Sequence, residues 1–168
     1  AEEARRLVAA GRGPASLGRT RIYLAPVLNP DGRARALEAP PRPGRLNAAG
    51  EGVDLNRDFP ARWSAAKARA SGPPQPETEA VMSFWREHPE IALAVSFHTS
   101  TSGFLAPPLP MSDRVRARYA ELAARYEQRL GLPRLAVPSH ARGTTMDWFF
   151  AARGCVAFTL EIEGAHRP

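Results

Sequence analysis

The chain has 168 residues, 43% of them hydrophobic, which suits one folded domain with a buried core and excludes a disordered chain. No stretch approaches the roughly 18–20 consecutive apolar residues of a membrane-spanning helix. The net charge of +6 comes mostly from arginines scattered among Asp and Glu, and this distribution argues against a nucleic-acid-binding surface. The one cysteine, Cys155, excludes an intramolecular disulfide and a cysteine-based zinc site, and its apolar surroundings predict a packing role.

Taken in chain order, the sequence alternates between helical and strand patterns. Helices are expected at residues 2–10, 77–87, 112–130 and 144–152, and strands at residues 21–28, 91–97, 135–137 and 155–162. The segment 29–32, NPDG, predicts a turn, and the Pro- and Gly-rich segments 33–52 and 61–76 predict loops. This alternation is typical of an α/β fold with a mixed, mostly parallel sheet flanked by helices. The near-continuous apolar run at 91–97 predicts a strand that is covered on both faces.

Two polar side chains stand near the ends of apolar strands, where ligands bind in sheets of this type. His98 follows the strand at 91–97, and its imidazole could be a metal ligand, a general base or an ordinary loop histidine. Glu161 lies inside an apolar strand, where a carboxylate costs free energy unless it is paired or protonated. It is therefore either a general base or a structural glutamate in a salt bridge, and Glu163 is predicted to share its face.

The segment 52–60, GVDLNRDFP, places an amide beside a guanidinium at Asn56 and Arg57. The donors of arginine form a rigid fork that suits a carboxylate, and asparagine adds a donor and an acceptor. One interpretation is a recognition edge for an anionic group. The other is a short edge strand with a solvated arginine.

A set of short segments follows one order along the chain: VLNPDG, RLNAAG, GVDLNRDFP, PQPETEAV, SFHTSTSG, RGTTMDW and FTLEIEG. This ordered set resembles the M14 metallocarboxypeptidase family, the zinc carboxypeptidases, and the resemblance extends over nearly the whole chain. GVDLNRDFP after NPDG is the most specific part of the resemblance. The sequence of this segment is most similar to that of bacterial members, including those that trim murein peptides. The resemblance implies the α/β fold of that family.

The resemblance implies a role for each matched position. His98 would be a zinc ligand, and Glu161 would be the general base that takes a proton from metal-activated water. Arg45 would stabilise the oxyanion that develops on the carbonyl. Asn56 and Arg57 would bind the terminal carboxylate of a peptide, which fixes the register of the chain end.

Other positions qualify the resemblance. Met146 stands where family members line the specificity pocket, and an apolar side chain there argues against selection for a basic C-terminal residue. None of the four histidines is followed three residues later by Glu, so the H-x-x-E motif that supplies the family's first two zinc ligands is expected before Ala1. The family's substrate-positioning tyrosine is also absent, and Ser139 and His140 stand in its neighbourhood. His140 could hydrogen-bond in its place or be a simple loop histidine.

Residues 1–168 are therefore expected to be one partial catalytic domain, incomplete at both ends, that alone binds zinc poorly, is inactive and is marginally stable. The whole protein is expected to be a zinc-dependent carboxypeptidase acting on a peptide or a peptidoglycan-derived substrate. One alternative is a related zinc deacylase of N-acyl amino acids, and another is a non-catalytic module that holds a carboxylate without metal. Oligomeric state stays open, as does location in the bacterial cytoplasm, in the periplasm or outside the cell.

Overall fold

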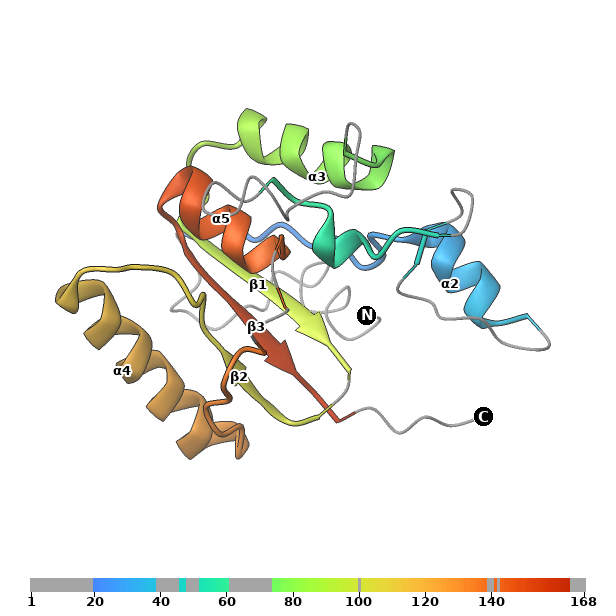
Figure 1. Cartoon of the computed structure of the whole chain (residues 1–168). Helices are drawn as coiled ribbons and strands as arrows, with labels where there is room; N and C mark the ends of the chain where they lie inside the picture. Colours follow the sequence, from blue (N-terminus) through green and yellow to red (C-terminus); the bar gives the residue numbers. More distant parts are fainter. Residues whose placement is uncertain are drawn as a thin grey trace.

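The computed structural model describes residues 20–38, 46–47, 52–60, 74–99, 101–138, 141 and 143–163. Within these residues the sheet has the strand order β1–β3–β2 (Figure 1), and its strands are β1 (Leu93–His98), β2 (Gly103–Leu105) and β3 (Val156–Glu161). The central strand β3 pairs in parallel with β1 and antiparallel with β2. The described sheet is therefore mixed, and the α/β fold that the sequence predicts is confirmed.

Helices lie on both faces of this sheet (Figure 1). The described helices are α2 (Pro30–Ala36), the 3₁₀ helix η2 (Leu55–Arg57), α3 (Pro76–Glu87), α4 (Asp113–Leu130) and α5 (Thr145–Arg153). In Figure 1, α4 lies on one side of the sheet next to β2, whereas α5 and α3 lie on the other side. None of the described helices is long and apolar enough to cross a membrane.

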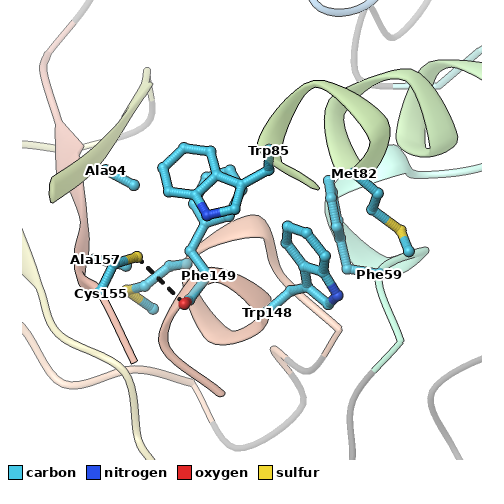
Figure 2. Close-up of a cluster of buried hydrophobic side chains, with 9 residues drawn as sticks. Phe59, Met82, Trp85, Ala94, Trp148, Phe149, Cys155 and Ala157 are labelled. Atoms are coloured by element: carbon cyan, nitrogen blue, oxygen red, sulfur yellow. Dashed lines mark hydrogen bonds between the residues drawn. The ribbon is translucent and has the colours of Figure 1, made fainter. Parts of the chain in front are cut away.

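Each face of the sheet has its own hydrophobic core, because alternate residues of β3 point to opposite faces. The α5 core consists of Phe59, Met82, Trp85, Ala94, Met146, Trp148, Phe149, Cys155 and Ala157 (Figure 2). The α4 core consists of Phe104, Ala106, Tyr119, Ala123, Leu132, Phe158 and Leu160. In the α5 core, the rings of Trp85 and Phe149 stack with their centroids 4.1 Å apart, which joins α3 to α5.

The helix ends follow local signals in the sequence. Ser112 caps α4, since its Oγ accepts a hydrogen bond from the N–H of Val115 at 3.4 Å, and Gly131 ends that helix with a φ of +65°. Thr144 caps α5 in the same way through the N–H of Asp147 at 3.1 Å. The helices predicted at 77–87, 112–130 and 144–152 are confirmed, each to within one residue at either end.

Two predictions for residues 21–32 are wrong. The segment 21–28 forms no strand, and the side chains of Ile22 and Leu24 are 51% and 57% exposed. Apolar residues form a strand only where a neighbour supplies hydrogen-bond partners, and no described strand pairs with this segment. NPDG forms no isolated turn, because Asn29 caps α2 by accepting from the N–H of Gly32 at 2.9 Å, with Pro30 in the first helical position.

Strand β1 lies at the edge of the described sheet, and the prediction that both of its faces are covered is wrong for these residues. Ala94 is buried in the α5 core, but Leu93 and Phe97 are 51% and 68% exposed on the opposite face. On that face α4 packs over β2 and β3, and no described element covers the two ends of β1.

Short strands were the hardest elements to predict from the sequence. No strand forms at 135–137, where one was expected; an isolated bridge joins the preceding residue, Arg134, to Phe104. Strand β2 was not predicted, because three residues after a loop of small residues are too few to show a periodic pattern. The helix expected at 2–10 and most of the loop expected at 61–76 lie outside the described residues.

Cys155 has the packing role that the sequence predicts. It is buried in the α5 core, and its Sγ donates to the carbonyl oxygen of Phe149 at 3.2 Å (Figure 2). Burial raises the pKa of the thiol to about 11, so the thiol stays protonated at neutral pH. A protonated, buried thiol is a poor nucleophile.

Tyr119 links α4 to the start of β3, and we expect its hydroxyl to make folding sensitive to alkaline pH. The buried hydroxyl donates to the carbonyl of Ala157 at 2.9 Å and accepts from the N–H of Ala157 at 3.0 Å, beyond the point where β2 ends. Burial raises the pKa of Tyr119 to about 12, above the value of about 10 for an unfolded tyrosine. Stability is therefore unaffected by this group below about pH 10 and falls as the pH rises from about 10 to 12.

Chemical denaturation of Tyr119→Phe checks this expectation. The substitution leaves the backbone of Ala157 without its partner, and we expect a loss of about 1–3 kcal/mol at neutral pH. The loss should shrink between pH 10 and 12, because phenylalanine cannot ionise. Tyr126→Phe is the control for the hydrogen bond at neutral pH, since Tyr126 is half-buried in the same core, where burial also raises its pKa, and forms no hydrogen bond with the described residues. An equal pH dependence in Tyr119→Phe and the unmodified chain would contradict the assignment.

Candidate active site

His98 and Glu161 are brought side by side by the parallel pairing of β1 with β3. They are register partners at the last position of each strand, and the N–H of Ile162 donates to the carbonyl of His98 at 2.9 Å. Register partners point to the same face of a sheet, here the face of Ala94 and Ala157 that carries the α5 core. The imidazole and the carboxylate therefore leave the sheet on the same side and at the same end.

One carboxylate oxygen of Glu161 has no partner in the described part of the chain. This oxygen, Oε2, is buried without a hydrogen bond, and no described cation forms an ion pair with the side chain. A buried oxygen left in this way costs about 1–3 kcal/mol or more, so a purely structural glutamate would be expected to have a partner. Glu163 is exposed beyond the end of β3.

Asn56 and Arg57 lie in η2, a 3₁₀ turn, and the edge strand considered for this segment does not form. Asp54 begins the turn by accepting at Oδ1 from the N–H of Asn56 at 3.1 Å, and it also forms an isolated bridge with Leu46. Nη1 of Arg57 donates to the carbonyl of Asn56 at 2.7 Å, and no described carboxylate forms an ion pair with this guanidinium. Its remaining donors can therefore serve an anionic ligand.

Thr145 holds the side chain of Asn56 from the N-terminal end of α5. Oδ1 of Asn56 accepts from the N–H of Thr145 and from its Oγ1, each at 3.0 Å, across 89 residues of sequence. Because the C-terminal end of α5 leads directly into β3, its N-terminal end lies toward the strand ends that carry His98 and Glu161 (Figure 1). Asn56 therefore shares one face and one end of the sheet with these two side chains.

The loop before α5 packs against the backbone of η2. The N–H of Phe59 donates to the carbonyl of Gly143 at 3.2 Å. Gly143 has a φ of +68°, and a Cβ there would lie 2.7 Å from the carbonyl oxygen of Arg57. On the other side, Oδ2 of Asp58 accepts from the N–H of Gln75 at 2.7 Å, next to the start of α3. The turn that carries Asn56 and Arg57 is thus held between α5 and α3.

Sequence reasoning missed Gly143 and Thr145 as parts of this site. One signal was present, because the first N–H groups of any helix need acceptors from outside that helix. Thr144 supplies an acceptor to Asp147, which leaves the N–H of Thr145 to find a partner on another segment. The sequence does not indicate that this partner is Asn56.

Met146 is the other expected site residue in the described part of the chain. Met146 is 3% exposed and packs in the α5 core, so its side chain forms no open wall of a pocket among the described residues. Arg45, expected to stabilise the oxyanion, lies outside the described residues, as do Ser139 and His140. A surface hollow of about 520 Å³ is lined by α4 and the turn from α5 to β3, and none of the expected site residues lines it.

The described residues hold one of the expected zinc ligands, the imidazole of His98. No group of three or more His, Cys, Asp or Glu side chains in the described part of the chain could hold a metal ion. A catalytic zinc usually has three protein ligands. The donor set of the described residues is therefore incomplete for zinc, and His98 can contribute to such a site only together with further ligands.

Gly143→Ala should disturb η2, whereas Gly154→Ala should not. Both glycines have positive φ, at +68° and +63°, so alanine costs each site about 1–2 kcal/mol in backbone strain. Only the Cβ at 143 meets backbone, since nothing lies within 4 Å of a Cβ at 154. We expect Gly143→Ala to be the less stable variant and to shift the amide NMR signals of residues 56–59. Equal stabilities and unchanged signals in both variants would contradict this packing.

Known proteins resemble this chain in sequence and in fold. The family model for Peptidase M14, described as "Zinc carboxypeptidase", matches residues 11–167. Human mast cell carboxypeptidase A is 29% identical over 177 residues, which cover 88% of this chain and 42% of that protein. The structure of carboxypeptidase A from Helicoverpa armigera has a TM-score of 0.68 at 21% identity and covers 86% of this chain and 42% of that chain. Murein-tripeptide amidase MpaA from Escherichia coli O157 has a TM-score of 0.56 at 27% identity, with coverages of 81% and 56%.

The chain spans only part of these relatives, including 6% of carboxypeptidase D from Anas platyrhynchos, to which it is 36% identical over 96 residues. The likeness to the Helicoverpa armigera structure shows the fold alone. The family match is broader, because it extends over nearly all of the chain and includes the segments that carry His98, Glu161, Asn56 and Arg57. The chain belongs to the peptidase M14 family of zinc carboxypeptidases.

Proposed function

We propose that the protein containing this chain is a zinc-dependent exopeptidase that hydrolyses the C-terminal peptide bond of its substrate, with Glu161 as general base. The observation that carries the proposal is the register pairing of His98 with Glu161 at one sheet end. Its support is the buried Oε2 of Glu161, which is without a partner among the described residues. A carboxylate in that state is suited to accept a proton from an attacking water molecule.

The turn η2 supplies the second half of the proposed site, a clamp formed by Asn56 and Arg57. A chain-end carboxylate has two acceptor oxygens, and the guanidinium of Arg57 and the amide of Asn56 offer donors to both. Binding the end of the chain at a fixed distance from Glu161 would restrict hydrolysis to the last peptide bond. Arg45 would stabilise the oxyanion, and this role rests on the family resemblance alone.

Zinc, held by His98 and ligands outside the described residues, would polarise the scissile carbonyl and lower the pKa of water. The residues described here do the remaining work. The Asn56–Arg57 clamp orients the substrate, and Glu161 holds and returns the proton. The β1–β3 pairing holds Glu161 at one end of the sheet. The N-terminal end of α5 holds Asn56 of the clamp toward that same end.

The substrate is proposed to be a peptide, and a cell-wall peptide is the more specific form of the proposal. The similarity to the murein-tripeptide amidase, at 27% identity, supports the cell-wall form. An assay of the full-length protein with unmodified peptides, murein tripeptide and N-acyl amino acids separates the classes. Turnover of N-acyl amino acids alone would identify a deacylase and overturn the exopeptidase proposal.

Glu161→Gln in the full-length protein should lower the rate of C-terminal hydrolysis by at least about 100-fold, because glutamine cannot accept the proton. The measurement is the rate at which the C-terminal residue is released at saturating substrate, with the released residue quantified by chromatography. Glu163→Gln is the matched control, since it removes the same charge two residues away on an exposed position. Equal rates in Glu161→Gln and the unmodified protein would remove Glu161 from the mechanism.

His98→Ala should lower the zinc affinity of the full-length protein by more than about tenfold, because the loss of one of three protein ligands opens the site. The control is His88→Ala, which removes an imidazole that contacts Tyr23 and Glu90 at the end of α3. Metal content after dialysis against a competing chelator gives the comparison. A full-length protein that binds no zinc at all would support the non-catalytic carboxylate-binding module instead.

A further inference from the structure

We propose that Thr145 is a positioning residue that fixes the orientation of the Asn56 amide and thereby makes the site select a chain-end carboxylate over a carboxamide. The inference rests on the proposed function, since it names what the same clamp selects and which residue sets that selection. Thr145 contacts Asn56, and its proposed role is to position Asn56 rather than to touch the substrate.

The geometry determines which end of the Asn56 amide faces α5. A backbone N–H can only donate, so the Asn56 atom that lies 3.0 Å from the N–H of Thr145 must be the oxygen Oδ1. The Thr145 hydroxyl donates to the same oxygen at 3.0 Å. The amide is planar, so Nδ2 lies on the other branch and points away from Thr145. Among the described residues Nδ2 forms no hydrogen bond.

Asn56 is therefore held as a donor, next to Arg57, which is always a donor. A carboxylate offers an acceptor oxygen to each of the two groups. A carboxamide has one oxygen, so its NH₂ group must face a donor at one of the two positions. Binding the carboxamide well would require the Asn56 amide to flip, and the flip breaks both hydrogen bonds from Thr145.

The neighbouring Thr144 provides a matched control. Its Oγ1 accepts from the N–H of Asp147 at 3.1 Å and caps α5, and no hydrogen bond joins it to Asn56 in the described part of the chain. Thr144→Val and Thr145→Val each remove one threonine hydroxyl, at adjacent positions. The first should lower stability alone, because a helix cap contributes about 1 kcal/mol. The second should alter the selectivity of the clamp.

The test uses the full-length zinc-loaded protein with Glu161→Gln, so that substrates bind without turnover. Two peptides of one sequence, ending in a carboxylate or a carboxamide, are titrated by calorimetry. We expect the parent to prefer the carboxylate and Thr145→Val to reduce that preference by about tenfold, the value of one hydrogen bond to a charged group. Thr145→Ser should restore the preference, and Thr144→Val should leave it unchanged. A preference unchanged in Thr145→Val, or absent in the parent, overturns the inference.

A second variant tests the orientation if Thr145→Val does not fold. Asn56→Asp keeps an oxygen toward Thr145 and replaces the donating Nδ2 by an acceptor. We expect this variant to prefer the carboxamide. A retained preference for the carboxylate would overturn the inference. Hydrolysis is measured separately with Glu161 intact. A protein that prefers the carboxylate but releases no C-terminal residue refutes the proposed function and leaves the role of Thr145 in place.

Discussion

The parallel pairing of β1 with β3 is the interaction on which the candidate site depends. It makes His98 and Glu161 register partners and turns both toward the α5 face. A slip of one residue would send Glu161 to the opposite face relative to His98. Both hydrophobic cores oppose such a slip, because Ala157 and Phe158 would have to exchange the faces on which they pack. The packing that stabilises the sheet therefore also specifies where the side chains of His98 and Glu161 lie.

Helix α5 also positions the Asn56–Arg57 pair that forms the proposed clamp. Its side chains Trp148 and Phe149 are anchored in the α5 core, and its C-terminal end continues into β3. Its N-terminal end donates to Asn56 through Thr145, and the preceding Gly143 accepts from Phe59. The proposed clamp is thus attached to the helix that leads into β3, the strand that carries the proposed base, Glu161. A displacement of α5 would move both together.

Sequence patterns predicted the parts of the fold that short-range chemistry determines. The helical patterns at 112–130 and 144–152 and the apolar runs at 91–97 and 155–162 identified the helices and strands around the site. The segment 21–28 was mistaken for a strand because strand formation requires a partner, which periodicity does not supply. The link from Asn56 to Thr145 joins positions 89 residues apart, so neither local propensity nor motif spacing could reveal it. Met146 was expected at the wall of a specificity pocket, and only tertiary packing shows that its side chain lies in the α5 core.

The bond from Nη1 of Arg57 to the carbonyl of its neighbour Asn56 has a consequence for binding kinetics and entropy. An arginine side chain that is free in solution loses roughly 2 kcal/mol of rotamer entropy when a ligand immobilises it. Here the Nη1 bond already restricts the side chain in the folded protein, so binding of an anion, as proposed, would not have to order the guanidinium again. A preorganised cation of this kind meets an incoming anion in its binding orientation. A lysine at this position would carry the same charge without the planar fork that allows one nitrogen to anchor while others bind.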